Sequence, residues 1–156
     1  VPRGGNALPP RTVANSLPAQ QARQMAAEME AAGEPVVVNL GGAGRPHEPP
    51  GAININNQAV KRSGIPKLVE ADGADVGELL GPATVDRVEG HRMAGGVIDW
   101  TRGAPGSFRV LKSGGKFRFS YQGATDDAVK LAAELEKAGF KDVSNQGNAL
   151  VTATKP

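Results

Sequence analysis

A short β-branched run followed by glycines is the feature that most limits the folds open to this chain. Residues 35–40 read PVVVNL, and Gly41, Gly42 and Gly44 follow almost directly. A continuous apolar run of this length predicts a strand buried on both faces, as in the centre of a parallel sheet. Ligands of such sheets bind where the strands end, so these glycines would let a ligand approach the backbone closely. A plain tight turn after a buried strand is the alternative.

Further strands and helices alternate along the rest of the chain. Caps and apolar spacing predict helices at 18–32, 75–80 and 126–138, a helix or turns at 95–110 around Trp100, and one helical turn within 57–62. Apolar or alternating segments predict strands at 51–56, 67–71, 85–90 and 116–121, and a hairpin at 141–145 and 150–154. In the 126–138 helix, Val129, Leu131, Ala132 and Leu135 are expected to face the core. This alternation predicts an α/β fold of three layers.

One connection departs from the usual pattern. Pro46, Pro49 and Pro50 exclude a helix interior between the first two strands. A parallel crossover normally takes a dozen or more residues, and residues 41–50 are short for one. An extended, proline-rich loop is therefore expected to make this connection.

Length and composition bound the remaining possibilities. The 156 residues suit one domain at 16–156 and a loose arm at 1–15, whose first residues read either as an expression-tag remnant or as a native loop. The absence of cysteine excludes disulfides, thiolate metal sites and cysteine nucleophiles. A net charge of +2 does not by itself argue for nucleic acid. No apolar run reaches the roughly 20 residues of a membrane span, and no spacing of His, Asp and Glu predicts a metal site.

The segment at 109–119, RVLKSGGKFRF, carries the most specific resemblance. Gly114 and Gly115 are expected to turn the chain with positive φ before a strand that alternates Phe and basic residues. This segment closely resembles the turn before the fifth strand of class I, S-adenosylmethionine-dependent methyltransferases. The order of segments over 35–156 is similar to that family, which implies a Rossmann-like, mostly parallel sheet with a C-terminal antiparallel hairpin.

The same resemblance implies a cofactor, S-adenosylmethionine, and the residues that would hold it. The matching positions are Asn39, Gly41, Gly42, Gly44, Asn54 and Asp72. Asp72 corresponds to the acid that contacts the adenine amine. The chain departs from the family at Asn39, where the first strand usually has an acid, and at Asn54 and Asn56, where a carboxylate usually holds the ribose.

A second resemblance concerns residues 38–56, VNLGGAGRPHEPPGAININ. This segment is similar to one in the C-terminal domains of bacterial polymorphic toxins of the Rhs and contact-dependent inhibition type. Membership would imply secretion or delivery into the cytoplasm of a target bacterium, and neutralisation by a cognate immunity protein. Without it, the expectation is a cytoplasmic protein.

Candidate catalytic residues are few. His47 lies beside the glycines and His91 follows the strand at 85–90, so either could be a general base; surface histidines are the alternative. Six arginines are scattered through the sequence and either form a patch for nucleic acid or are solvated: Arg45, Arg87, Arg92, Arg102, Arg109 and Arg118. Three functions stay open at this point: a methyltransferase, a toxin that uses this fold on nucleotides or nucleic acid, and a non-catalytic binding module. The substrate, a small molecule or a nucleic acid, is not specified.

Overall fold

The computed structural model describes residues 12–57 and 64–156. They form a seven-stranded sheet in the order β3-β2-β1-β4-β5-β7-β6. The strands are β1 (Val37–Leu40), β2 (Ile53–Ile55), β3 (Leu68–Val69), β4 (Val85–Met93), β5 (Leu111–Tyr121), β6 (Lys141–Gln146) and β7 (Leu150–Thr154). Strands β1 to β5 pair in parallel, and β7 runs antiparallel to both β5 and β6. The mostly parallel sheet and the C-terminal hairpin predicted from the sequence are confirmed.

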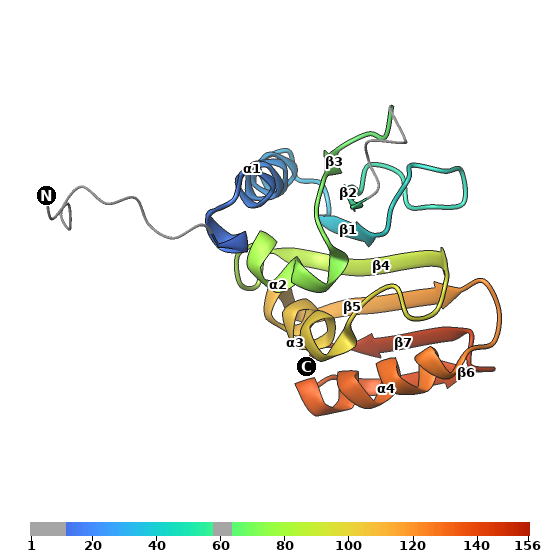
Figure 1. Cartoon of the computed structure of the whole chain (residues 1–156). Coiled ribbons are helices and arrows are strands. Elements are labelled where there is room, and N and C mark those ends of the chain that lie inside the picture. The colour runs from blue at the N-terminus through green and yellow to red at the C-terminus, as the bar shows by residue number, and fades with distance from the viewer. Residues whose placement is uncertain (1–11, 58–63) are drawn as a thin grey trace, which may run out of the picture.

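The expected helix-free connection between β1 and β2 is also confirmed. The two strands pair in parallel, with Val38 beside Ile53, although no helix lies between them. The proline-rich loop at 41–52 makes the whole connection (Figure 1). The helical turn predicted within 57–62 lies almost entirely outside the described residues.

The helices form a single layer. They are α1 (Leu17–Ala31), α2 (Val76–Leu79), α3 (Trp100–Val110) and α4 (Asp126–Ala138), with 3-10 turns η2 (Val13–Asn15) and η4 (Gly73–Asp75). Helix α1 contacts α2, α2 contacts α3, and α3 contacts α4, so the four lie in a row on one face of the sheet (Figure 1). The predicted three-layer arrangement is therefore wrong for the described residues. The proline-rich loop stands where a helix on the second face would follow β1.

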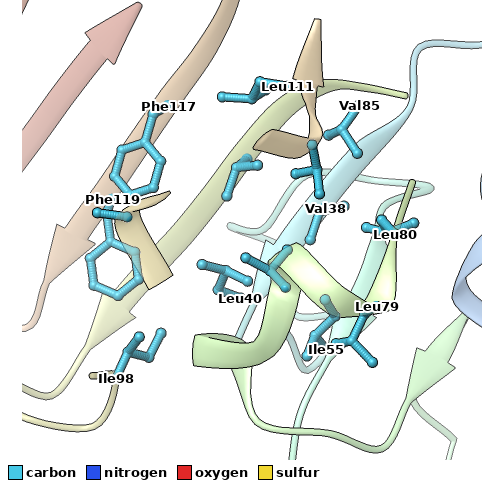
Figure 2. Packing of buried hydrophobic residues seen from close by; sticks show 14 of the residues in the cluster. Val38, Leu40, Ile55, Leu79, Leu80, Val85, Ile98, Leu111, Phe117 and Phe119 are labelled. Atoms are coloured by element: carbon cyan, nitrogen blue, oxygen red, sulfur yellow. The ribbon is translucent and has the colours of Figure 1, made fainter. Parts of the chain in front are cut away.

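One hydrophobic core lies between the sheet and this layer of helices. Alternate strand residues supply it, among them Val38, Leu40, Phe117 and Phe119 (Figure 2). Trp100 packs edge-on against Phe119, with ring centroids 4.8 Å apart. In α4 the core positions are Ala128, Leu131 and Leu135, whereas Val129, predicted to face inward, is 51% exposed. Leu131 and Leu135 face the core as predicted and Ala132 packs against it, so only the first turn differs, where the spacing of three and four residues places Ala128 inward.

The other face of the sheet, here called the outer face, is polar and charged. The register places its residues side by side: Arg87 beside Lys116, Glu89 beside Arg118, and Arg118 beside Thr152. Asn39 and Asn54 continue this face on β1 and β2. The outer face therefore differs in chemistry from the apolar face beneath the helices.

Local details differ from the predictions in three places. Strand β4 runs to Met93, so His91 lies within the strand instead of after it. At the Gly-Gly turn only Gly114 has a positive φ, of 83°, and β5 continues through both glycines. In the expected arm, Val13 packs against the core, while residues 1–11 lie outside the described part. None of the helices described is long and apolar enough to cross a membrane.

Candidate functional site

A crevice opens at the carboxyl edge of the sheet, where β1 and β4 are neighbours. The chain leaves β1 toward β2 on one side, whereas β4 is followed by β5 on the other. Such a reversal of strand order is where open α/β sheets bind ligands. A cavity of about 300 Å³ lies here, lined by Gly41, Ala43, Arg45, Glu48, Asn56, Asn57, His91, Arg92, Met93, Ala94, Val97 and Gln122. A hollow of about 20 Å³ adjoins it and is lined by Asp72, Gly73, Ile98 and several of the same residues.

Met93 separates these two spaces. It lines both of them, and its side chain lies directly over Gly41. A Cβ on Gly41 would stand 2.3 Å from the Met93 Cε, so only glycine leaves room for this contact. Gly41 also has a φ of +72°, which favours glycine. The thioether is flexible, so a small rotation would join the hollow to the larger cavity.

A buried carboxylate holds the glycine loop in place. Glu48 Oε1 accepts hydrogen bonds from Asn39 Nδ2 at 2.7 Å and from the Ala43 backbone N–H at 2.8 Å. Its Oε2 accepts from the Arg45 N–H at 3.3 Å. The residue is only 9% exposed. The chain thus lacks an acid at position 39 but supplies one from the loop, and that acid occupies N–H groups of the loop.

Asn39 and Asn54 form the floor beneath this loop. The Asn39 Nδ2 group also donates to Asn54 Oδ1 at 3.1 Å, and Asn54 Nδ2 donates to the Pro66 carbonyl at 2.8 Å. Gly42 lies against this pair, since a Cβ there would stand 2.0 Å from Asn54 Oδ1. Neither asparagine lines the cavity, so their role in the described structure is to shape the loop.

Asp72 lies at the far end of the crevice, after β3. Its Oδ1 accepts from the Ala74 N–H at 2.9 Å and so caps the 3-10 turn η4. Its Oδ2 is 3.6 Å from Arg102 Nη2. The side chain is 41% exposed, which leaves it accessible to a ligand in the small hollow.

His91 is part of a charged row on β4. Its Nε2 lies 2.7 Å from Glu89 Oε1, and Arg87 Nε is 3.2 Å from the other carboxylate oxygen. Alternate positions of a strand share one face, which explains why these three side chains meet. A neutral His91 that donates from Nε2 to Glu89 carries a lone pair on Nδ1, the form required of a base.

The other two predicted residues are less central. His47 Nε2 is 3.9 Å from Glu48 Oε2, and the ring does not line the cavity. Gly44 has a φ of +70° and packs against Pro66, to which a Cβ would come within 2.7 Å. The structure therefore brings Gly41, Asp72 and His91 to one crevice and leaves His47 and Gly44 beside it.

Sequence reasoning missed Met93 and the role of Glu48. Met93 gives no signal, because a methionine two residues after a histidine in a strand has no special pattern. Glu48 was visible as an acid in a glycine- and proline-rich loop, but its reach back to Asn39 depends on the path of the loop.

A cavity of about 340 Å³ lies away from this edge, between α1 and the segment that follows α2. Its two cations are already engaged: Arg23 donates to the Glu78 carbonyl, and Lys112 pairs with Glu30 and Asp86. The crevice at the carboxyl edge, with a free imidazole nitrogen and an accessible carboxylate, is therefore the better candidate for chemistry.

Comparison with solved structures identifies the fold. A methyltransferase from Thermotoga maritima, described as a possible histamine N-methyltransferase, superposes with a TM-score of 0.56 at 17% identity over 90% of this chain and 92% of its own. A methyltransferase from Archaeoglobus fulgidus gives 0.56 at 13% identity, over 85% and 93%. The 16S rRNA (adenine(1408)-N(1))-methyltransferase of Catenulisporales acidiphilia gives 0.51 at 14% identity, over 96% and 95%.

The chain thus has the fold of class I, S-adenosylmethionine-dependent methyltransferases. No protein-family model matches its sequence, and no curated protein sequence does. The likeness is therefore one of fold.

Proposed function

We propose that this chain binds S-adenosylmethionine in the carboxyl-edge crevice and transfers its methyl group to an acceptor. The observation that carries the proposal is the pair of adjoining spaces at Gly41, of which the smaller reaches Asp72 and the larger reaches His91. A solved structure with the same fold, at a TM-score of 0.53, is an rRNA methyltransferase with its cosubstrate bound. That likeness supports the class of cofactor.

The residues present fit a nucleoside cofactor if Met93 rotates. The Asp72 carboxylate would accept from the adenine amine, and Gly41 would let the cofactor lie against the backbone of β1. Asn56, which donates to the Gly42 carbonyl at 3.1 Å, would stand near the ribose. The bound cofactor would supply an activated methyl group, and the larger cavity would hold the acceptor.

His91 would act on the acceptor. An amine or hydroxyl that is methylated must lose a proton, and Nδ1 of a neutral His91 could accept it. Glu89 would orient the ring and stabilise the imidazolium that forms, while Arg87 holds the other carboxylate oxygen at 3.2 Å. His91 is thus the catalytic candidate, and Glu89 a positioning residue.

Calorimetric titration with S-adenosylhomocysteine tests the proposal. The wild-type protein should bind, and Asp72→Asn should bind about tenfold or more weakly, as expected for a lost hydrogen bond to a charged group. Asparagine still caps η4, so this variant should fold. Asp142→Asn, at an exposed position of β6 where φ is +55°, is the matched control. The proposal is contradicted if the wild type gives no heat of binding, or if Asp72→Asn and Asp142→Asn bind with equal affinity.

A toxin role is a second candidate. The segment at 38–56, which is similar to polymorphic toxin domains, contains most of β1, the loop held by Glu48, and β2. This part of the chain departs from a helix-covered sheet. Expression in the bacterial cytosol would then arrest growth, and a cognate immunity protein would rescue it, by covering the crevice near Arg45 and His91. His91→Gln should abolish toxicity and His47→Gln should not. Harmless high-level expression of the intact domain would reject this role.

A further inference from the structure

The outer face of the sheet has no helix over it in the described structure, and its exposed charges are mainly positive. Arg87, Lys116, Arg118 and Lys141 are all exposed there. The register joins them into one surface, because Arg87 lies beside Lys116 and both Lys116 and Lys141 pair with Thr154. Cations from β4, β5 and β6 therefore form a continuous patch, although they are scattered in the sequence.

Little negative charge offsets this patch. Glu89 is the acid that the register places among these cations; it is 8% exposed, and its carboxylate is already engaged by Arg87 and His91. Arg118 and Lys141 have no ion-pair partner among the residues described. The whole chain carries a net charge of only +2. Four exposed cations against one buried acid on this face show that positive charge is gathered here.

The spacing of these cations suits an extended polyanion. Alternate residues of a strand are about 6.8 Å apart, and neighbouring strands are about 4.8 Å apart. Lys116, Arg118 and Arg87 therefore form a set of regularly spaced positive charges. Among the residues described, this face has no Phe, Tyr or Trp side chain for base stacking, because the aromatic residues of β5 point into the core. Contacts would therefore go to phosphates and sugars, and not to base edges.

Hydroxyl groups accompany the cations. Thr152 lies beside Arg118, and Ser144 lies beside Thr152. Hydroxyls that donate and accept suit the 2′-hydroxyl groups that distinguish RNA from DNA. Over β4 to β7 the described part of the outer face offers no helix to enter the groove of a duplex.

We propose that the outer face binds single-stranded RNA through its sugar-phosphate backbone. The strand would cross β6, β7, β5 and β4 and reach the crevice at His91, with Arg45 and Arg92 at the rim of the cavity. Binding in this way needs neither the cofactor nor methyl transfer. It therefore goes beyond the proposed function, and can hold or fail independently of it.

Fluorescence anisotropy with a labelled, mixed-sequence 12-nucleotide RNA tests this, without cofactor, from about 50 to 200 mM salt. Phosphate contacts by Lys116, Arg118 and Lys141, which have no ion-pair partner among the described residues, predict a slope of log K against log salt of about −2. The double variant Lys116→Gln, Arg118→Gln should reduce the magnitude of that slope by about 1.4 and weaken binding about tenfold at low salt. The matched control is Lys130→Gln with Lys137→Gln on the exposed side of α4. It should bind like the wild type.

Several outcomes would overturn the proposal. They are no binding by the wild type at 50 mM salt, equal loss in the α4 control, or unchanged binding in the β5 variant. Equal affinity for DNA of the same sequence would remove the RNA assignment, and tighter binding of duplex RNA would remove the single-strand one. Stronger binding of polyglutamate would indicate an acidic protein partner instead. Far-UV circular dichroism of each variant verifies folding, which exposed substitutions should not change.

Discussion

At the scale of single residues, Glu48 explains how a chain with Asn39 in its first strand still has an ordered glycine loop. Its buried carboxylate accepts from one side chain and two backbone N–H groups. Glu48→Ala should lower the free energy of unfolding by about 1–3 kcal/mol, because these donors lose a charged acceptor. Urea unfolding measures this, with the exposed Glu136→Ala as control. A loss no larger than the control's would mean that water replaces the carboxylate.

Tyr121 gives a second residue-scale prediction. Burial, and then its hydrogen bond to Asp127 Oδ2 at 2.6 Å, raise the pKa of this phenol well above its ordinary value of 10.0. It is the only tyrosine, so ultraviolet absorbance at high pH reports it alone. The folded protein should show no ionisation near pH 10, whereas the urea-unfolded protein should.

The same shift affects stability. Above pH 10 the unfolded chain loses a proton that the folded chain keeps, so the unfolding free energy should fall as pH rises. Tyr121→Phe should remove this part of the pH dependence. Ionisation of the native protein at its ordinary pH would contradict the buried hydrogen bond.

At the scale of elements, α2 and α3 approach closely because glycines face each other. A Cβ on Gly106 would stand 2.8 Å from the Gly77 backbone nitrogen, and one on Gly77 would stand 2.6 Å from the Gly106 Cα. An exposed helical Gly→Ala change normally stabilises by about 1 kcal/mol. Gly106→Ala should instead destabilise by about 1–3 kcal/mol through overpacking. Thermal unfolding tests the sign, with Gly123→Ala, where the Cβ has open space, as control.

The helices and strands also show how much of the fold the sequence predicts. Helix α4 was predicted with its observed bounds, because Thr125 and Gly139 cap it at both ends. The hairpin of β6 and β7 followed from alternation around a turn with Gly147. Strand β3 was predicted longer than its two residues, Leu68–Val69, because the extent of pairing depends on the neighbouring strand and not on propensity.

The site was less predictable than the elements. Gly41 and Asp72 were predicted from their place after strands, and the carboxyl edge does bring both to one crevice. The spacing of residues in the sequence does not predict the contacts of Glu48 and Met93, because each of these residues contacts a different segment of the chain that folding brings beside it. His91 was placed after its strand, but it lies within β4, where alternation sets it beside Glu89.

At the scale of the whole molecule, one layer of helices covers one face of the sheet, and a single core joins all parts described. That core runs from Ala22 in α1 through β1 and β5 to Val151 in β7. No part of it could lose its packing without exposing the rest, which predicts two-state unfolding. Trp100, the only tryptophan, packs in this core against Phe117 and Phe119 and is 4% exposed.

Urea unfolding followed by two probes tests this cooperativity. Trp100 fluorescence reports packing beneath α3, and far-UV circular dichroism reports all helices and strands, so the two curves should have the same midpoint and slope. Gly106→Ala should move both midpoints down together, because the α2–α3 contact belongs to the same core. An earlier transition by circular dichroism would mean that α1 and the β3 side of the sheet unfold separately. The sheet would then be divided between β1 and β4, where the connections diverge.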